Sequence, residues 1–231
     1  MARLFDKRQR KLSRVGMICA AAAALLAPVA SSAALLGTTL TFPQLSFDNQ
    51  GTTSYDATTD QFTVDASPIA IRLVAGGTPI LITPTGSGEA FGINVTIDDS
   101  GALVGGAPGN DLVVVGNVNL GGLGTFSGTL LTGEITAFGF QDSGGTTDFY
   151  DFTFALTGGD LAFLYSPTLA VSLTSEQSSF TGDFTVDFGG EAKGTLGSTV
   201  IPIPPAVWLF SSGLLGIVGI SRRRRGRRAT H

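Results

Sequence analysis

The sequence predicts an all-β domain over residues 34–199, built as an antiparallel two-sheet sandwich or jelly-roll-like fold. Short runs rich in β-branched and aromatic residues alternate there with clusters of Gly, Asp, Asn, Ser and Pro. Several runs alternate apolar and polar residues, and none repeats apolar residues with the period of a helix. The spacing of these runs predicts about eight to eleven strands joined by short turns.

Residues 1–33 have the features of a secretory signal peptide. Six basic residues in the first 14 positions precede the apolar run MICAAAAALLAPVA, and small residues follow at 31–33. We expect cleavage after Ala33, and Ala34 is an equally suitable end. An uncleaved N-terminal anchor is the alternative, but the run is short for a bilayer core of about 30 Å. Cys19, the only cysteine, lies in this run, so the mature protein would contain no disulfide.

The predicted strands lie in runs bounded by turn residues. In chain order these are QFTVDASPIAIRLV (61–74), FGINVTIDDSGALVGG (91–106), DLVVVGNVNL (111–120), GTFSGTLLTGEITAFGF (124–140), TTDFYDFTFALTGGDLAFLYS (146–166), LAVSLTS (169–175) and SSFTGDFTVDFGG (178–190). The second run predicts two strands joined by residues 98–101, a type I turn followed by Gly101 in the left-handed region. QFTVDAS (61–67) and DFTVDFG (183–189) are nearly alike, and we interpret both as an edge or hairpin strand.

The run DFYDFTFALTG predicts a strand with one face on a core, because its residues alternate with period two. One face would carry Phe149, Asp151, Thr153 and Ala155, and the other Tyr150, Phe152, Phe154 and Leu156. The chain has 16 phenylalanines but only one tryptophan and two methionines, so Phe should supply most of the core.

Charge is segregated along the chain. Residues 34–199 contain 17 acidic residues and only two basic ones, Arg72 and Lys193, which gives this region a net charge of −15. Such a domain repels nucleic acid, and we exclude DNA and RNA as partners.

The residue inventory argues against an enzyme. The only histidine is His231, beyond the predicted domain, which excludes Ser-His and Cys-His nucleophiles and histidine-ligated metals from it. A glycosidase that uses two carboxylates is the least favoured alternative, with Glu89, Glu134, Glu176 or one of many aspartates as candidates.

Calcium is the only cofactor that the sequence suggests, because it binds hard oxygen ligands. Candidate ligands occur as the pairs Asp56/Asp60, Asp98/Asp99, Asn110/Asp111 and Asp148/Asp151. We favour the interpretation that these carboxylates hydrogen-bond their own turns, as aspartates often do, and that no metal is bound.

The C-terminal residues 200–231 combine three features in a fixed order. Pro202, Pro204 and Pro205 form a proline box at 200–205, and residues 206–221 carry no charge. The apolar stretch reaches about 25 Å as a helix, enough for a short transmembrane span. Four consecutive arginines at 222–225 open an Arg-rich end, 222–231, which would stay in the cytoplasm and fix the orientation.

This arrangement resembles the PEP-CTERM sorting signals of Gram-negative, biofilm-forming bacteria, in particular the variant built on Val-Pro-Leu-Pro-Ala. The resemblance covers about the last 30 residues, with Ile203 in place of the glutamate that gives the family its name and Pro205 as an extra residue before Ala206. It implies that an exosortase, a membrane-embedded cysteine protease, cuts the chain near Pro202, Ile203, Pro204, Pro205 and Ala206. Arg222, Arg223, Arg224 and Arg225 would act as the membrane stop.

These features predict a structural or interaction protein of the cell envelope or extracellular polysaccharide matrix. It would cross the inner membrane, remain anchored there transiently, and then reach the surface or the extracellular space. The alternative is a carbohydrate-binding β-sandwich module, with or without calcium, in which Tyr55, Tyr150 and Tyr165 are the candidate contact residues.

Overall fold

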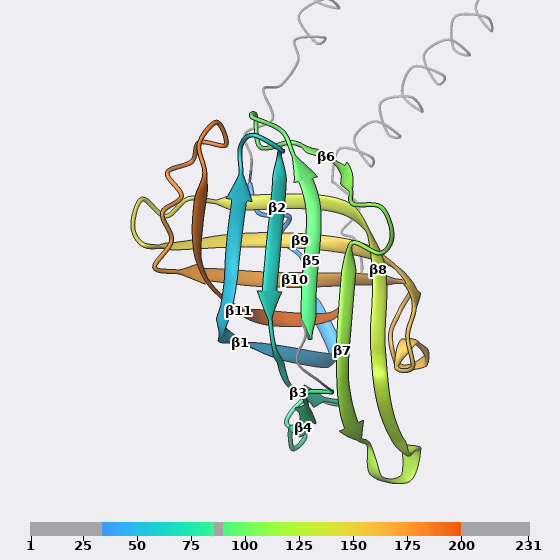
Figure 1. Ribbon diagram of the computed structural model, residues 1–231. Helices are drawn as coiled ribbons and strands as arrows, with labels where there is room; N and C mark the ends of the chain where they lie inside the picture. Colours follow the sequence, from blue (N-terminus) through green and yellow to red (C-terminus); the bar gives the residue numbers. More distant parts are fainter. Residues whose placement is uncertain (1–33, 86–89, 200–231) are drawn as a thin grey trace, which may run out of the picture. The chain divides into compact units, whose positions relative to one another are not determined.

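The computed structural model describes residues 34–85 and 90–199, which lie in one compact unit (Figure 1). Its strands are β1 (Leu40–Asp56), β2 (Gln61–Ala66), β3 (Pro68–Arg72), β4 (Ile80–Thr83), β5 (Phe91–Ile97), β6 (Leu103–Gly106), β7 (Leu112–Asn119), β8 (Thr125–Gln141), β9 (Thr147–Gly158), β10 (Thr168–Glu176) and β11 (Phe188–Thr199). Two single 3₁₀ turns, η2 (Gly121–Leu123) and η3 (Ala162–Leu164), are the only helical elements of the described part. The predicted all-β class and strand number are confirmed. Within 34–85 and 90–199, no helix is both long enough and apolar enough to cross a bilayer.

All eleven strands pair in the antiparallel sense and form one hydrogen-bonded sheet. Their order is β11-β10-β9-β8-β7-β4-β3-β1-β2-β5-β6, with additional pairings of β11 with β1 and of β7 with β5. Figure 1 shows β9 and β10 running crosswise behind β2 and β5, whereas β8 runs first beside β7 and then bends to join β9. The division into two sheets, as in a sandwich or jelly roll, stays a prediction, because the pairings link all strands.

The core is aromatic, as the composition predicts. Phe62 of β2 is fully buried, and its ring lies 5.0 Å from that of Tyr150 and 5.7 Å from that of Phe152, both on β9. These contacts pack β2 face to face on β9. Further phenylalanines extend the cluster toward one end of the sheet, among them Phe138, Phe140, Phe180, Phe184 and Phe188.

The turn predicted between β5 and β6 is confirmed. Gly101 has φ +78° and donates its backbone N–H to the carbonyl of Asp98 at 2.8 Å. The Asp98 carboxylate accepts three more hydrogen bonds from the same turn, from the amide and hydroxyl of Ser100 and the amide of Ala102. A side chain at position 101 would require strained backbone, so glycine is needed here.

The alternation predicted in β9 is confirmed on the core face and is incomplete on the other. Tyr150, Phe152 and Phe154 are buried, but Asp151 and Thr153 on the opposite face are buried as well. Residues 34–39 cover that face: the amides of Leu36 and Gly37 hydrogen-bond the Asp151 carboxylate. Desolvation by this cover raises the pKa of Asp151 above its usual value, against the effect of the hydrogen bonds that it accepts.

The interpretation of DFTVDFG as a strand is wrong. Residues 177–187 form a loop between β10 and β11, and only Phe188 and Gly189 of that fragment belong to β11. Phe184 is buried although it is not in a strand, and its ring lies 4.8 Å from that of Phe140. The apolar residues of this fragment therefore cover the end of the core. QFTVDAS does form β2, which makes a hairpin with β1 across residues 57–60. Because β2 also pairs with β5, it is a hairpin strand and not an edge strand.

Candidate functional site

Two of the four predicted calcium pairs are turn residues. The Asp56 carboxylate accepts the amides of Thr58 and Thr59, and Asp98 caps the β5–β6 turn. These hydrogen bonds lower the pKa of both carboxyl groups below the usual value. Asp56 and Asp98 thus hydrogen-bond to their own turns, as the favoured interpretation predicts.

Asp148 and Asp151 do not lie together in the structure. The two residues are separated by an odd number of positions on β9, so their side chains point to opposite faces of the sheet. Asp148 is fully buried and accepts the amide of Ser143 at 3.1 Å, whereas Asp151 lies under residues 34–39.

The remaining pair, Asn110/Asp111, lies at a junction of three strands. Asp111 directly precedes β7; its amide donates to the carbonyl of Gly133 on β8, and its carbonyl accepts the amide of Asn94 on β5. These bonds hold the backbone in place and turn the carboxylate inward, where it accepts the amide of Ile135 at 2.7 Å. Asp111 is only 2 % exposed.

Glu134 of β8 is the second acidic residue at this junction. Its side chain is exposed and lies beside the carboxyl group of Asp111, because the pairing of Leu112 with Gly133 brings the two residues together. Partial desolvation and the neighbouring charge of Asp111 raise the pKa of Glu134. Two carboxyl groups therefore lie side by side here.

A groove of about 260 Å³ lies beside Asp111, over β2, β5 and the start of β7. Its polar lining includes Thr63, Asp65, Asn94 and Asn110. The Asn110 side-chain oxygen also accepts the hydroxyl of Thr157 at 2.8 Å. We name Asp111, Glu134 and this groove the Asp111 site. Within the described ranges, no three His, Cys, Asp or Glu side chains are gathered in a way that would hold a metal ion.

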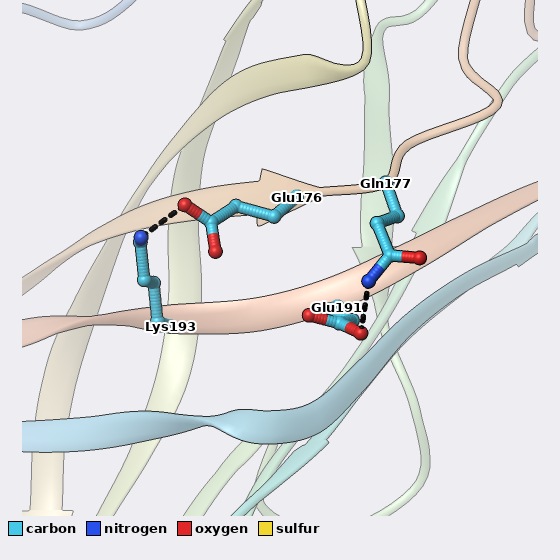
Figure 2. Close-up of polar contacts among 4 residues, drawn as sticks. All are labelled: Glu176, Gln177, Glu191 and Lys193. Carbon is cyan, nitrogen blue, oxygen red and sulfur yellow. Dashed lines mark hydrogen bonds and ion pairs between the residues drawn. The ribbon is translucent and has the colours of Figure 1, made fainter.

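In contrast to the Asp111 site, the acidic residues at one end of the β10–β11 ladder have side-chain partners that balance their charge. Glu176 and Glu191 are register partners, so two like charges lie opposite each other across the ladder. Figure 2 shows that Lys193 forms an ion pair with Glu176 and that the Gln177 amide donates to Glu191. One of the two basic side chains of the domain is thus used to neutralise this pair.

The tyrosines predicted as a carbohydrate platform are unsuited to that role. Tyr55, Tyr150 and Tyr165 are 2 %, 1 % and 9 % exposed. The Tyr55 hydroxyl donates to the carbonyl of Ile97 at 2.8 Å inside the domain. None of these three tyrosines could contact a sugar unless the core opened. The carbohydrate-binding alternative therefore loses its candidate residues.

Two of the candidate glycosidase carboxylates lie beside other charged side chains. Glu176 forms the ion pair with Lys193, and Glu134 lies beside Asp111. Glycosidases hold their two carboxyl groups about 5–10 Å apart, with the sugar between them. Glu89 lies outside the described residues.

The predicted sorting residues also lie outside the described residues. These are Pro202, Ile203, Pro204, Pro205, Ala206, Arg222, Arg223, Arg224 and Arg225, together with the predicted signal peptide at 1–33. The sequence alone does not associate Glu134 with Asp111, because the two residues are far apart along the chain and Glu134 lies on β8, whereas Asp111 precedes β7. The pairing of Leu112 with Gly133 brings them together, and no local sequence signal reports that register.

Comparison with known proteins found no matching family model, no similar curated protein and no matching solved structure.

Proposed function

We propose that this chain is an exported structural or interaction protein of the cell envelope or extracellular polysaccharide matrix, delivered by a C-terminal sorting signal. The observation that carries this proposal is the order of the proline box, uncharged segment and arginine cluster over residues 200–231. An exosortase is the processing partner, the inner membrane is the transient anchor site, and exopolysaccharide is the surrounding material. The chain is the substrate of that reaction, and its own residues serve as recognition elements.

The end of the described domain supports this proposal. β11 is described as far as Thr199, and its last buried apolar residue is Leu196, which precedes the predicted proline box. Cleavage near 202–206 would therefore leave every described strand intact. Six residues, 200–205, separate Thr199 from the uncharged segment, and an extended chain of that length reaches at most about 20 Å. Before cleavage the domain would be held close to the outer face of the inner membrane.

The proposal includes the finer description of the fold as a two-layer sandwich. Contacts of Phe62 with Tyr150 and Phe152 support two layers, since they join β2 to a strand that is not adjacent to it in the sheet order. Such a domain with many short turns and a high negative charge suits a soluble surface component.

A double-label experiment tests the sorting proposal. An epitope in the domain and a second tag after His231 are followed in a host with an exosortase. We expect the two labels to separate, with the domain label in the surface or extracellular fraction. Changing Pro202 and Pro204 to Ala should keep both labels together in the membrane, whereas the matched control Pro84→Ala, in an exposed coil of the domain, should separate them as the unchanged chain does. Neutralising Arg222–Arg225 should weaken membrane retention and orientation.

If both labels stay in one band of unprocessed size in the unchanged chain, the proposal of a sorting signal is wrong. The chain would then be an envelope protein with a permanent C-terminal anchor.

A further inference from the structure

The Asp111 carboxylate has one satisfied and one unsatisfied oxygen. Oδ2 accepts the amide of Ile135, whereas Oδ1 is buried and has no hydrogen-bond partner among the described residues. The carboxylate lies over Gly106: a Cβ built on that glycine would be 1.8 Å from Oδ1. A buried charged oxygen without a partner is costly, so its presence calls for a ligand.

The neighbour of this carboxylate adds to the cost. The pairing of Leu112 with Gly133 places Glu134 beside Asp111, and two ionised carboxyl groups side by side repel each other. A proton or a cation between its members stabilises such a pair.

No basic side chain of the described domain is available to serve as that cation. Only Arg72 and Lys193 occur in this part of the chain. Lys193 is paired with Glu176, and Arg72 lies in a separate groove with Gln44 and Ser46. The domain also carries a large negative charge, which attracts small cations from solution.

The groove supplies the other ligands that a hard cation needs. Thr63, Asn94 and Asn110 place neutral oxygen-bearing side chains along it, and its volume of about 260 Å³ also admits water. Calcium takes six to eight oxygen ligands and accepts carboxylates, amide carbonyls and water in flexible geometry.

We propose that the Asp111 site binds a calcium ion, held between the carboxylates of Asp111 and Glu134 and completed by groove oxygens and water. Asp111 supplies the buried ligand through Oδ1, and Glu134 supplies the second charge from the surface. Two carboxylates make a weak site, with a dissociation constant of about 10⁻⁴–10⁻³ M, as in extracellular calcium modules. The ion ties the start of β7 to β8 and thereby fixes the β6–β7 connection at residues 107–110. This site goes beyond the proposed sorting function and does not depend on it.

Equilibrium dialysis with radioactive calcium tests the site on the full-length chain in mild detergent. We expect a single saturable site in the unchanged chain. Glu134→Gln and Asp111→Asn should each weaken binding by about tenfold or more, because the ion loses one of its two charged ligands. Asp98→Asn is the matched control, since Asp98 bonds only its own turn, and it should bind as the unchanged chain does.

Thermal unfolding of Glu134→Gln distinguishes a bound cation from a proton shared by the two carboxyl groups. Glu134 is exposed, so we expect this variant to fold. In chelator, the variant should melt above the unchanged chain, because the repulsion with Asp111 is removed. In millimolar calcium the order should reverse. Three results would overturn the proposal and leave a pair of carboxyl groups that share a proton. The unchanged chain would bind no calcium saturably, or Glu134→Gln would bind calcium as well as the unchanged chain does. The third is that the higher melting temperature of Glu134→Gln is the same in chelator and in calcium.

Discussion

Leu40 and Thr199 are register partners at the first position of β1 and the last position of β11. The pairing continues along both strands as far as Tyr55 and Phe188, and the Thr199 hydroxyl also donates to the carbonyl of Thr39 at 3.1 Å. The first and last strands of the domain therefore lie side by side along most of their length.

The first prediction is that residues 34–199 fold without the flanking segments, because the first and last strands complete each other's hydrogen bonds. A chain of this length should unfold cooperatively with a free energy of about 5–15 kcal/mol. Far-UV circular dichroism with a urea titration measures this. A helical spectrum, or a broad transition without a baseline, would contradict the prediction.

The second prediction concerns Phe62, at the centre of the aromatic core. Phe62→Ala should lower the free energy of unfolding by about 3–5 kcal/mol, since it leaves a cavity among several packed rings. The matched control is Phe163→Ala on η3, where the side chain is 63 % exposed and the change should stay within about 0.5 kcal/mol. Equal losses in the two variants would mean that the core is not organised around Phe62.

The strands that could be predicted from the sequence are those that alternate or run continuously apolar, such as β5, β7, β9 and β10. β1 and β11 are less apparent. β11 contains Gly189, Gly190, Gly194 and Gly197, a composition typical of a loop. The structure makes it a strand because its neighbours approach closely: a Cβ on Gly194 would lie 2.2 Å from the carbonyl oxygen of Ser172. The need for glycine at these positions comes from the packing of neighbouring strands, so the local sequence does not show it.

The third prediction concerns the like-charged partners Glu176 and Glu191. Lys193→Gln removes the cation that balances them and should lower the free energy of unfolding by about 0.2–1 kcal/mol. Arg72→Gln removes the same charge from β3, away from this pair, and should cost less. The difference should shrink in about 1 M salt, where the Debye length is about 3 Å. Urea titrations of both variants at low and high salt measure it, and a larger cost for Arg72→Gln would contradict the assignment.

The fourth prediction concerns alkaline pH. Burial, followed by the nearby charge of Asp60, raises the pKa of Tyr55 to about 12. The folded state therefore holds this proton more tightly than the unfolded chain, whose tyrosines ionise near pH 10. The resulting stability is fully present below pH 10 and is lost as the pH rises toward 12. Tyr55→Phe should remove part of this pH dependence and lower stability at neutral pH by about 1 kcal/mol, through loss of the hydrogen bond to Ile97.

Tyrosinate absorbance checks the alkaline prediction. The chain has three tyrosines, and burial also raises the pKa of Tyr150 and Tyr165. Their ionisation should coincide with unfolding. A phenolic titration completed near pH 10, while the circular dichroism of the sheet is unchanged, would contradict the buried positions.

The candidate site was only partly predictable. Asn110 and Asp111 stand out as adjacent oxygen-bearing residues, but so does Asp98, which only caps its turn. What distinguishes Asp111 is its burial and its position beside Glu134, 23 positions away along the chain. Both depend on the register of β7 with β8, which is fixed by the core and not by the residues of the site.

The intact mass of the protein recovered from the surface of its host distinguishes a sorting signal at residues 200–231 from a permanent anchor. We expect a chain that begins after Ala33 or Ala34 and ends within 202–206, with or without an attached acceptor at the new C-terminus. Recovery of a chain that still carries Arg222–Arg225 and His231 would contradict it.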